Sequence, residues 1–502
     1  MKRKPNVLMI LTDQFNPNCL GFLGSQVKTP NLDRLAGDGV YFPNAFCNAP
    51  ICGPSRASYV TGQYPRTHRI HGNHIFEMND RNEHTLGAVF RRSGYETALV
   101  GKAHMIEEWD REGFEHRRYC DLIDCDKSDP LKNDYFRHLN DNGLADEYDL
   151  GTLKDDHTGK KSWAFMSDIP DEHSLETWTG NEALNILRNR DETRPFFMLM
   201  SFQRPHTPYT APKDTGLLYD PEQIELPANA ADYFENDYAS KPAFIRQFFM
   251  KEKRNESKAD YARRLKETLA YYYTLITHID TQIGRVIEHL ESAGEYGNTV
   301  ISFSADHGDF AGEHGQMKKN AGIYDSIHRI PFILRYPDGP AGARREGLVE
   351  SIDLYPTFCG LCGIGAPDAV EGESLLPVAE GRNGGKAQAF AEFNHGWYDN
   401  TINAIVTGRH RLVYYNSELG GELYDREKDP GELNNLYDDP ACRDIRERLM
   451  CRLFDHVNNF SLKASIRETD KLHRFPNSFC SMLQFGKKSW KEIEPLYRET
   501  RR

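Results

Sequence analysis

The sequence predicts an α/β fold: a large, mostly parallel sheet between layers of helices, followed by a smaller C-terminal subdomain built on a short antiparallel sheet. Apolar runs rich in β-branched residues alternate with helical patterns, which is typical of parallel sheets covered on both faces. The predicted strands are 6–11, 96–101, 195–202, 299–305 and 330–335. The predicted helices are 30–37, 84–93, 173–190 and 258–293. In the last helix apolar residues recur every three or four positions, and Gly294 ends it.

The pattern changes after about residue 380. Segments 387–395, 401–408 and 410–416 resemble short antiparallel strands, and a helix is expected near 440–459. We therefore predict an α/β domain at 1–378, an antiparallel-sheet subdomain with a packing helix at 379–460, and an extension at 461–502. The polar stretches 150–172 and 206–257 are predicted to be long loops that wall a substrate cleft.

Composition excludes several classes of protein. The 502 residues are 39% hydrophobic and 27% charged, as in soluble globular proteins, and the net charge of −13 argues against a general nucleic-acid or membrane-surface binder. No apolar run is long enough to span a membrane. The first apolar run is too short for a signal peptide, so we expect a cytoplasmic protein, or a periplasmic one if a leader has been removed.

The ten cysteines show no regular framework, which favours free thiols in a reducing compartment. Cys359 and Cys362 have the spacing of a redox motif. The same spacing also fits the apolar face of a short helix that ends at Gly363, and the general tendency of free cysteine to be buried favours this second interpretation.

Polar side chains follow the ends of four predicted strands. They are Asp13 and Gln14, Lys102 and His104, the segment from Gln203 to His206, and Asp306 and His307. In parallel sheets, sites gather at the carboxyl ends of the strands, so we expect these residues to converge there.

The pairs Asp13–Gln14 and Asp306–His307 predict a divalent-cation site. Oxygen ligands from Asp13, Gln14 and Asp306 favour Ca²⁺, Mg²⁺ or Mn²⁺, while the imidazole of His307 leaves Zn²⁺ or Mn²⁺ open. The alternative for either pair alone is a helix cap or a turn.

Lys102 and His104 stand two residues apart in "GKAH", so in extended chain both would face the same side. A lysine beside a histidine suits an anionic group, because one neutralises charge and the other transfers protons. His206 lies in a loop stiffened by Pro205 and Pro208. A solvent-exposed role is the alternative for each histidine, and Lys318 and Lys319 alone would be taken as solvated.

The stretch 48–68 places Cys52 between Pro50 and Pro54, in what we predict is a rigid turn, with Arg56 four residues later. This C-x-P-x-R pattern resembles the signature of type I sulfatases, members of the alkaline phosphatase superfamily in which the cysteine is oxidised to formylglycine. The resemblance extends along most of the chain. It includes "TDQ", "KTPNLDRLAGDGVYFPNAF", "GYETALVGKAHM", "QRPHTPY", "SADHGD", "RIPFILRYP", "SIDLYPT", "GESLLP" and "ELYDREKDPGELNNL".

The resemblance implies a role for each matching residue. Cys52 would become the formylglycine nucleophile and a metal ligand, and Arg56 would orient the formylglycine hydrate. Lys319, or Lys318 if the alignment slips by one, matches a lysine of the family site. The remaining matches are Lys102, His104 and His206 as catalytic residues, and Asp13, Gln14, Asp306 and His307 as ligands of one divalent cation, with Ca²⁺ favoured.

Two positions depart from the lysosomal enzymes, which have a second aspartate in place of Gln14 and an asparagine in place of His307. The variants found here resemble bacterial choline-sulfatases and phosphonate monoester hydrolases. One carboxylate fewer makes the site less anionic, which weakens an electrostatic preference for Ca²⁺.

The resemblance therefore implies a sulfuric ester hydrolase that acts on a sulfated carbohydrate or small alcohol and is matured by a formylglycine-generating enzyme. The alternative within enzymes is a phosphonate or phosphate ester hydrolase. In phosphonate hydrolases, however, hydroxyl residues are expected at Lys102 and His104. A catalytically silent protein that binds sulfated ligands would lack catalytic residues, and every expected position is filled. Nucleic acid and membrane are not expected partners, and the C-terminal tail is a candidate contact for a homo-oligomer.

Overall fold

The computed structural model describes residues 3–73, 84–104, 113–121, 133–148, 154–155, 161–251, 253, 256–319, 322–394, 401–416 and 418–471. Residues Met1–Leu453 form one compact unit, and Phe454–Arg502 form a second, whose described part is helical. None of the described helices is long and apolar enough to cross a membrane.

The core of the first unit is an eight-stranded sheet with the order β13-β2-β12-β11-β1-β9-β4-β5. Neighbours from β11 to β5 pair in parallel, and β12 pairs antiparallel with both β11 and β2. The strands are β1 Asn6–Thr12, β2 Val40–Tyr41, β4 Glu96–Gly101, β5 His116–Tyr119, β9 Phe196–Phe202, β11 Thr299–Ala305, β12 Phe332–Arg335 and β13 Ala343–Arg344. Every residue of β1, β9 and β11 is buried, which explains why these strands contain only apolar and uncharged polar residues. The predicted mostly parallel sheet is confirmed.

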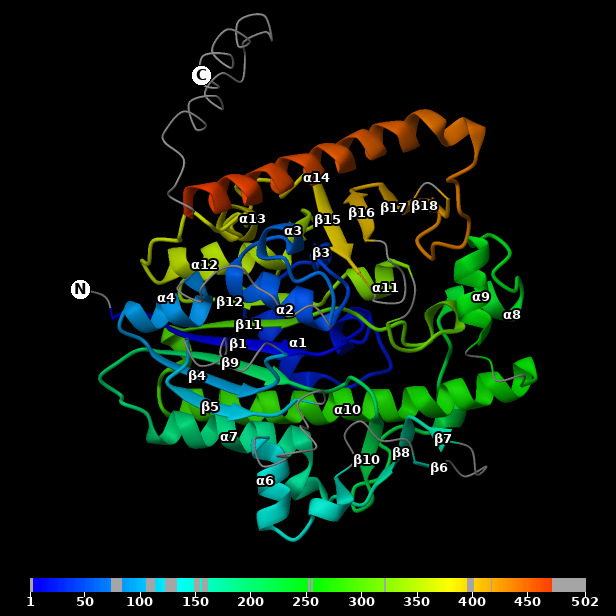
Figure 1. Cartoon of the computed structure of the whole chain (residues 1–502). Coiled ribbons are helices and arrows are strands. Elements are labelled where there is room, and N and C mark those ends of the chain that lie inside the picture. The colour runs from blue at the N-terminus through cyan, green and yellow to red at the C-terminus, as the bar shows by residue number, and fades with distance from the viewer. Residues whose placement is uncertain are drawn as a thin grey trace, which may run out of the picture. The chain divides into compact units, whose positions relative to one another are not determined.

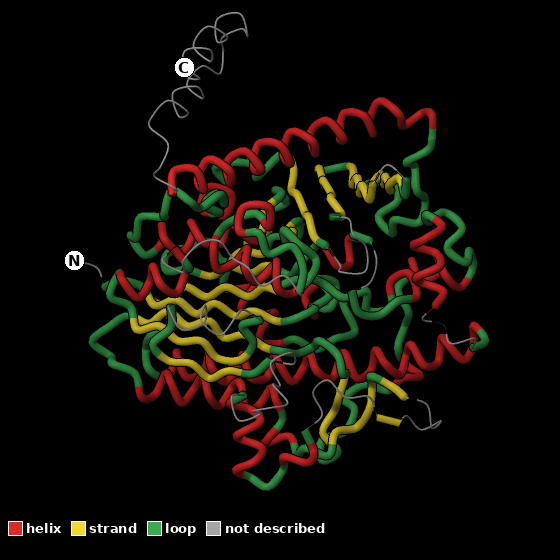
Figure 2. The backbone as a smooth tube through the Cα atoms, in the orientation of Figure 1, coloured by secondary structure: helices red, strands yellow, loops and turns green. Residues whose placement is uncertain are grey.

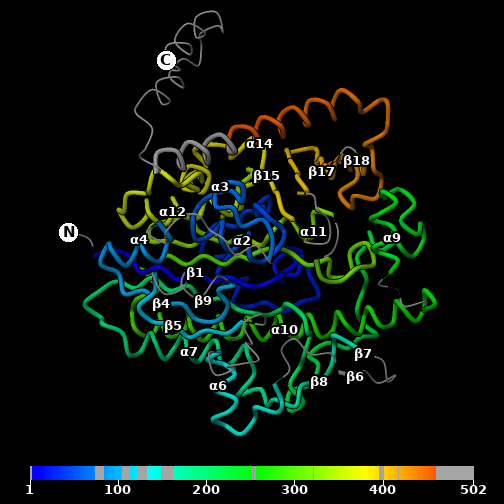
Figure 3. Tube along the Cα trace, viewed as in Figure 1, coloured from blue at the N-terminus to red at the C-terminus, as the bar shows by residue number. Residues whose placement is uncertain are grey.

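Helices cover both faces of this sheet, as Figure 1 shows, with α7 and α10 on one side and α2, α4 and α12 on the other. Figure 2 shows the strands of this sheet as one layer between helices, and Figure 3 shows that β1, β9 and β4, distant in sequence, lie side by side. The helices of this unit are α1 Pro30–Gly37, α2 Cys52–Thr61, α3 Pro65–His68, α4 Leu86–Arg92, α6 Asp134–Asp141, α7 Leu175–Asn189, α8 Ala231–Phe234, α9 Ala243–Lys251, α10 Lys258–Ser292, α11 Asp325–His328, α12 Leu354–Leu361 and α13 Leu376–Ala379.

The longest predicted helix is confirmed almost residue for residue. The Ser257 side chain caps the start of α10 by accepting a hydrogen bond from the backbone of Asp260. Gly294, with φ of 70°, turns the chain away after its last turn.

A separate antiparallel sheet follows, as predicted, with the order β15-β16-β17-β18. Its strands are β15 Gln388–Phe393, β16 Ile402–Thr407, β17 His410–Asn416 and β18 Gly420–Asp425, and helix α14 spans Arg443–Lys471. The buried Arg411 of β17 joins this sheet to the main body through an ion pair with Asp325 of α11, and it also pairs with Glu432, which follows β18. The proposed domain boundaries at residues 378 and 460 stay predictions.

The prediction of long loops was wrong in part. Residues 150–172 contain β6 Lys154–Asp155, β7 Lys161–Ser162 and β8 Ala164–Ser167, and residues 206–257 contain β10 Tyr209–Pro212 together with α8 and α9. Short two-stranded sheets join β6 to β7, β8 to β10, and β3 Ala45–Phe46 to β14 Val349–Glu350. Helix α9 buries Ile245 and Phe249 on one face, a signal too short to stand out in a polar segment.

The eight cysteines in the described part of the chain are all free, as expected. Cys359 lies in α12 and Cys362 caps it, and both are buried, which confirms that they belong to the core. Cys125 and Cys480 lie outside the described residues.

Candidate active site

Cys52 is the first residue of helix α2 and does not lie in a turn, which corrects the sequence prediction. Pro54 is tolerated in the first helical turn because an N–H there would have no partner within the helix. All ten residues of α2 are buried, and Gly62 ends it with φ of 66°. The Cys52 side chain, 1% exposed, therefore lies at a helix N-terminus, where backbone N–H groups favour negative charge.

Three other potential ligands surround Cys52. Asp13 follows β1, and Asp306 and His307 follow β11. Because Thr12 pairs with Ala305, these strand ends lie side by side. The ligand atoms of all four residues lie within 4.8 Å of one another, and each residue is buried. We call Asp13, Cys52, Asp306 and His307 the cluster. The Cys52 Sγ is 3.3 Å from His307 Nε2 and 3.7 Å from an Asp13 carboxylate oxygen.

The arrangement of these residues fits a divalent cation. The Nδ1 of His307 lies 2.8 Å from the Gly308 carbonyl oxygen; a hydrogen bond from Nδ1–H would leave the lone pair of Nε2 facing the cluster. The Asp306 carboxylate accepts hydrogen bonds from the backbone of Gln14 and His307, which fixes its orientation. Carboxylate oxygens with one imidazole suit Mn²⁺, Ca²⁺ or Zn²⁺ and do not single out one of them.

Gln14 adopts the left-handed conformation, with φ of 65°, which is uncommon for a residue other than glycine. Its side-chain oxygen accepts a hydrogen bond from Lys319 at 2.8 Å, and its side-chain nitrogen donates to Asp309 at 2.7 Å. These two contacts orient the amide, so its oxygen faces the Lys319 ammonium and its nitrogen faces the Asp309 carboxylate.

Two buried cations hold the carboxylates of the cluster. Arg56 contacts Asp306 at 2.8 Å and Asp13 at 3.3 Å, and it also donates to Ser201 Oγ at 2.7 Å. Lys102 Nζ is 2.6 Å from the same Asp13 carboxylate. Burial alone would raise the pKa of Asp13, but Lys102 and the other nearby cations hold it well below its usual range. Asp13 is therefore ionised at neutral pH.

The pKa of Cys52 shifts in the opposite direction to that of Asp13. Burial, followed by the negative charge of Asp13, raises the pKa of its thiol to about 11. As encoded, this side chain is a protonated thiol at neutral pH and not a reactive thiolate.

The histidines predicted from the sequence lie near the same centre. The ring of His104 is 5% exposed, and neither ring nitrogen has a hydrogen-bond partner among the described residues; its Nδ1 is 3.9 Å from Asp121. The His206 Nδ1 lies 2.7 Å from the Thr207 carbonyl oxygen. Burial and neighbouring lysines lower the pKa of both histidines well below its ordinary value. Both are therefore neutral at pH 7 and can accept a proton.

The chain between Lys102 and His104 is not the extended segment expected from the sequence. Strand β4 ends at Gly101, and His104 has φ of 54°, so the backbone turns after the strand. The turn directs the Lys102 ammonium to Asp13 and brings the His104 ring near Gly53, next to Cys52.

Lys318 and Lys319 point to different surroundings. Lys319 reaches Gln14, whereas the Lys318 ammonium lies 4.7 Å from the centre of the Trp163 ring. The backbone is left-handed at Lys318, with φ of 68°, at the point where the two lysine side chains take different directions. The geometry supports Lys319 as the lysine that faces the cluster.

Two residues near the centre were missed by the sequence analysis. The Asn73 side chain accepts a hydrogen bond from Gly53 N at 2.9 Å and so holds the start of α2. Asp309 accepts hydrogen bonds from Gln14, Tyr209 and the backbone of Lys318. Asp309 stands in the "SADHGD" motif, which was a usable signal, whereas nothing in the sequence separates Asn73 from other loop asparagines.

The chain matches two family models. Residues 5–364 match the model described as "Sulfatase", and residues 312–459 match "N-sulphoglucosamine sulphohydrolase, C-terminal". The arylsulfatase of Clostridium perfringens is 32% identical over 462 residues, covering 86% of this chain and 90% of that protein. This chain belongs to the sulfatase family. It is therefore a hydrolase of sulfuric esters, and the family prediction is confirmed.

Other relatives extend the comparison. The N-acetylglucosamine-6-O-sulfatase of Bacteroides thetaiotaomicron is 27% identical to this sulfatase over 499 residues, which is 87% of this chain and 83% of that one. Among solved structures, the phosphonate monoester hydrolase of Silicibacter pomeroyi superposes with a TM-score of 0.75 at 27% identity, covering 90% of this chain and 95% of the other. The fold is that of the alkaline phosphatase superfamily, as predicted.

Proposed function

We propose that this sulfatase hydrolyses sulfate esters of a carbohydrate through a formylglycine formed from Cys52, together with one divalent cation. The observation that carries the proposal is the position of Cys52, buried at a helix N-terminus with its sulfur among Asp13, Asp306 and His307. The C-x-P-x-R sequence that begins at Cys52 supports it. A formylglycine hydrate would supply a hydroxyl group that attacks the sulfur of the ester.

In this proposal Asp13, Gln14, Asp306 and His307 hold the cation, with residue 52 completing the set. A divalent cation would supply Lewis-acid stabilisation of the charged sulfuryl oxygens. To accept the cation, Gln14 Oε1 must share its position with the Lys319 hydrogen bond, so a direct ligand role for Gln14 depends on movement of that lysine. Ca²⁺ is our first choice, with Mn²⁺, Mg²⁺ and Zn²⁺ as alternatives.

The remaining charged residues make the site a receptor for an anion. Arg56, Lys102 and Lys319 supply three cations against the two carboxylates of Asp13 and Asp306. Arg56 keeps both carboxylates in place, while Lys102 and Lys319 face the position of a bound sulfuryl group. Preorganised charges of this kind usually contribute the largest share of catalysis.

The histidines supply proton transfer. His104, next to residue 52 and neutral at pH 7, is placed to take a proton from a hydroxyl there. His206, with Nδ1 near Thr207, would keep Nε2 for the leaving oxygen of the ester, and a bound anion would raise its lowered pKa.

A sulfated sugar is the substrate class that the relatives favour. The Bacteroides relative is named for 6-O-sulfated N-acetylglucosamine, and it aligns with this chain over most of its length. A panel of sulfated monosaccharides, with choline sulfate and an aryl sulfate as controls, tests this choice. Turnover of choline sulfate alone would contradict a carbohydrate substrate.

Phosphonate monoester hydrolysis is the second candidate, because the phosphonate hydrolase structure superposes over 90% of the chain. We expect faster turnover of an aryl sulfate than of an aryl phosphonate, since Lys102 and His104 are retained. Parallel measurements of kcat/KM on 4-nitrophenyl sulfate and 4-nitrophenyl phenylphosphonate check this expectation. A higher kcat/KM for the phosphonate would reverse the order of the two candidates.

His206→Ala should slow hydrolysis of a sugar sulfate far more than that of an aryl sulfate. A nitrophenolate leaves without a proton, whereas a sugar alkoxide needs one, and general acid catalysis contributes roughly 10²–10⁴-fold. The measurement is kcat for both substrates in the parent protein and the variant. His116→Ala, at a half-exposed histidine of β5, is the matched control and should leave both rates unchanged. Equal losses on the two substrates in His206→Ala would exclude a leaving-group role.

A further inference from the structure

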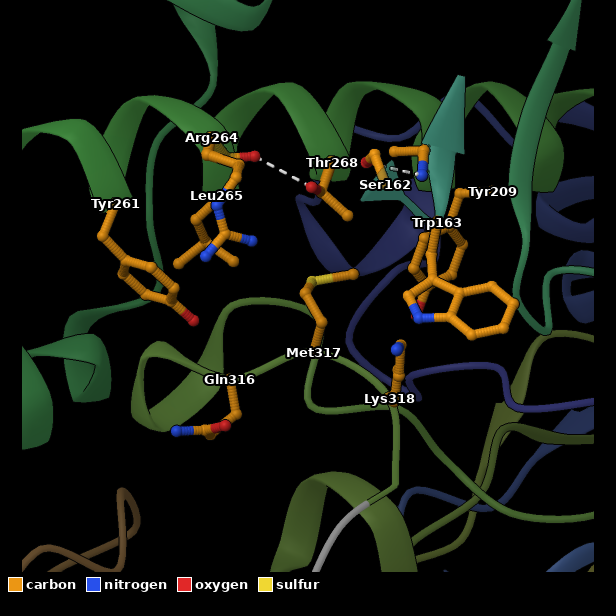
Figure 4. A pocket seen from close by; sticks show the side chains of 11 residues that line it. Ser162, Trp163, Tyr209, Tyr261, Arg264, Leu265, Thr268, Gln316, Met317 and Lys318 are labelled. Carbon is orange, nitrogen blue, oxygen red and sulfur yellow. Dashed lines mark hydrogen bonds between the residues drawn. The ribbon is translucent and has the colours of Figure 1, made fainter. Parts of the chain in front are cut away.

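A layer of hydrogen-bonded side chains separates the cluster from the pocket between α10 and residues 316–318 (Figure 4). The Tyr209 hydroxyl, which lines that pocket, donates to Asp309 at 2.9 Å. Gln14 donates to Asp309 at 2.7 Å and to Tyr209 at 3.4 Å. Groups that assist the chemistry at residue 52 must therefore lie on the other side of this layer, where the cluster is.

His104 lies beside residue 52 with both ring nitrogens unused. Its side chain is 5% exposed, and neither nitrogen has a hydrogen-bond partner in the described part of the chain. Its Cδ2 lies 3.6 Å from the position that a Cβ at Gly53 would take, so the ring edge formed by Cδ2 and Nε2 faces the start of α2. A buried polar atom without a partner costs free energy, so we expect the working site to supply a partner for each nitrogen.

Asp121 faces the opposite edge of the same ring. Its Oδ2 lies 3.9 Å from Nδ1 of His104, and its side chain is 1% exposed. A shift of about 1 Å would bring the two atoms to the length of a charge-assisted hydrogen bond. Nδ1 makes no other hydrogen bond within the described ranges, so the ring gives up no contact by making this one.

The backbone at Asp121 is held by the sheet and by a neighbouring side chain. Cys120 N donates to the Gly101 carbonyl oxygen at 3.1 Å, which extends the pairing of β5 with β4 beyond the last strand residue. The Asn133 side chain donates to the carbonyl oxygen of Asp121 at 3.2 Å. Asp121 thus follows the end of β5, and His104 follows the end of its neighbour β4, so the sheet sets the distance between the two residues.

Most neighbours of His104 oppose a positive charge on its ring. Burial, followed by the charge of Lys102, lowers the pKa of this histidine well below its ordinary value, and Asp13 offsets the shift only in part. A ring that takes a proton from residue 52 becomes positive in these surroundings. A carboxylate held at Nδ1 would lower the free energy of the charged ring. It would also keep Nδ1 protonated, because the hydrogen bond at one ring nitrogen decides the state of the other.

We propose that Asp121 is a positioning residue of the hydrolysis, which acts through His104. Its carboxylate accepts a hydrogen bond from Nδ1–H of His104 and so keeps Nε2 directed at residue 52. A hydroxyl group there gives its proton to the lone pair of Nε2, the oxygen keeps the electron pair of the broken O–H bond, and the Nδ1 proton stays on the ring. Asp121 offsets the charge that the ring gains. The proposal rests on the proposed function, because it takes His104 as the base.

A double-mutant cycle in the formylglycine-containing protein tests the link. Asp121→Asn keeps the shape of the side chain and should lower kcat for an aryl sulfate by roughly 10- to 100-fold, with KM nearly unchanged. His104→Ala should lower kcat further. Because Asp121 acts through the ring, adding Asp121→Asn to His104→Ala should lower kcat by no more than about twofold. Losses that multiply in the double variant would overturn the proposal.

The second measurement needs neither formylglycine nor turnover. In the full chain that retains the Cys52 thiol, nitrogen-15 NMR of labelled histidine reports which ring nitrogen of His104 carries the proton, and His104→Ala assigns the signal by its loss. We expect the proton on Nδ1 in the parent protein and on Nε2 in Asp121→Asn, where an amide N–H can face Nδ1. A proton on Nε2 in the parent protein overturns the proposal, even where Asp121→Asn proves unstable.

Asp134→Asn is the matched control, because Asp134 supports the same end of β5. Its carboxylate accepts a hydrogen bond from Tyr119 N at 2.6 Å and pairs with Arg137. This variant should retain both kcat and the tautomer of His104, even if its melting temperature falls. An equal loss of kcat in Asp134→Asn would attribute the effect of Asp121 to the strand and refute the proposal. Failure of the proposed function is read separately, from a formylglycine-containing parent protein that does not hydrolyse aryl sulfates, and it leaves the tautomer measurement unaffected.

Discussion

Replacing Cys52 with alanine is expected to abolish sulfate ester hydrolysis, lowering kcat by a factor of roughly 10⁴ or more. The residue lies among three potential metal ligands at the start of α2, so alanine would remove both the proposed nucleophile and a proposed ligand. Hydrolysis of 4-nitrocatechol sulfate measures the loss. The mass of the peptide that contains residue 52 must be measured alongside, because formylglycine and cysteine differ in mass.

Cys47→Ala is the matched control for this variant. Cys47 is also fully buried and lies five residues away, but its sulfur faces the Ile327 carbonyl oxygen and not the cluster. This variant should retain activity. If Cys52→Ala retained the activity of a fully modified parent protein, the assignment of the nucleophile would be wrong.

Asp13→Asn is expected to lower both the bound divalent metal and the activity, the latter by about 10³-fold. The substitution removes one proposed anionic ligand and leaves Lys102 and Arg56 without their shared carboxylate charge. Metal content by inductively coupled plasma mass spectrometry separates loss of the cation from loss of chemistry. Breaking a buried ion pair costs about 3–5 kcal/mol, so the melting temperature should be recorded as well.

Asp280→Asn provides the comparison for a buried carboxylate outside the site. Asp280 is 1% exposed and accepts hydrogen bonds from the backbone of Asn31 and Leu32. This variant should keep its metal even if its melting temperature falls. Full metal occupancy in Asp13→Asn would remove Asp13 from the ligand set.

The central strands could be predicted because their burial is complete. Every residue of β1, β9 and β11 is buried, so their sequences are mainly apolar and contain no charged residue. The edge strand β5, with the sequence HRRY, could not be predicted in this way, because backbone pairing with β4 holds it and its side chains are largely exposed. Strand β2 was not predicted either, because it is only two residues long and is held by its pairing with β12.

The convergence of Asp13, Lys102 and Asp306 could be predicted because all three follow strands of one parallel sheet. The residues that support them could not. Asn73 acts through a contact with Gly53, and Ser201 through a contact with Arg56, and neither contact follows from local sequence. The helical start at Cys52 was missed because flanking prolines indicate a turn as readily as a helix N-terminus.

The sequence alone also could not decide whether Lys318 or Lys319 faces the cluster. In sequence the two are identical neighbours, and only the left-handed backbone at Lys318 and the Trp163 ring beside it assign them to different surroundings. A backbone dihedral that departs from the common range is not encoded by a residue type such as lysine, which tolerates it without favouring it.

The burial of residue 52 has a consequence for when its side chain can be modified relative to folding. With 1% of Cys52 exposed and every residue of its helix covered, no oxidising enzyme can reach the sulfur once the chain has folded. If Cys52 is oxidised to formylglycine as we propose, the oxidation must therefore take place before the chain folds. Under this proposal the fraction of active protein depends on the relative rates of oxidation and folding, and folded molecules that still carry the cysteine stay inactive until they are unfolded.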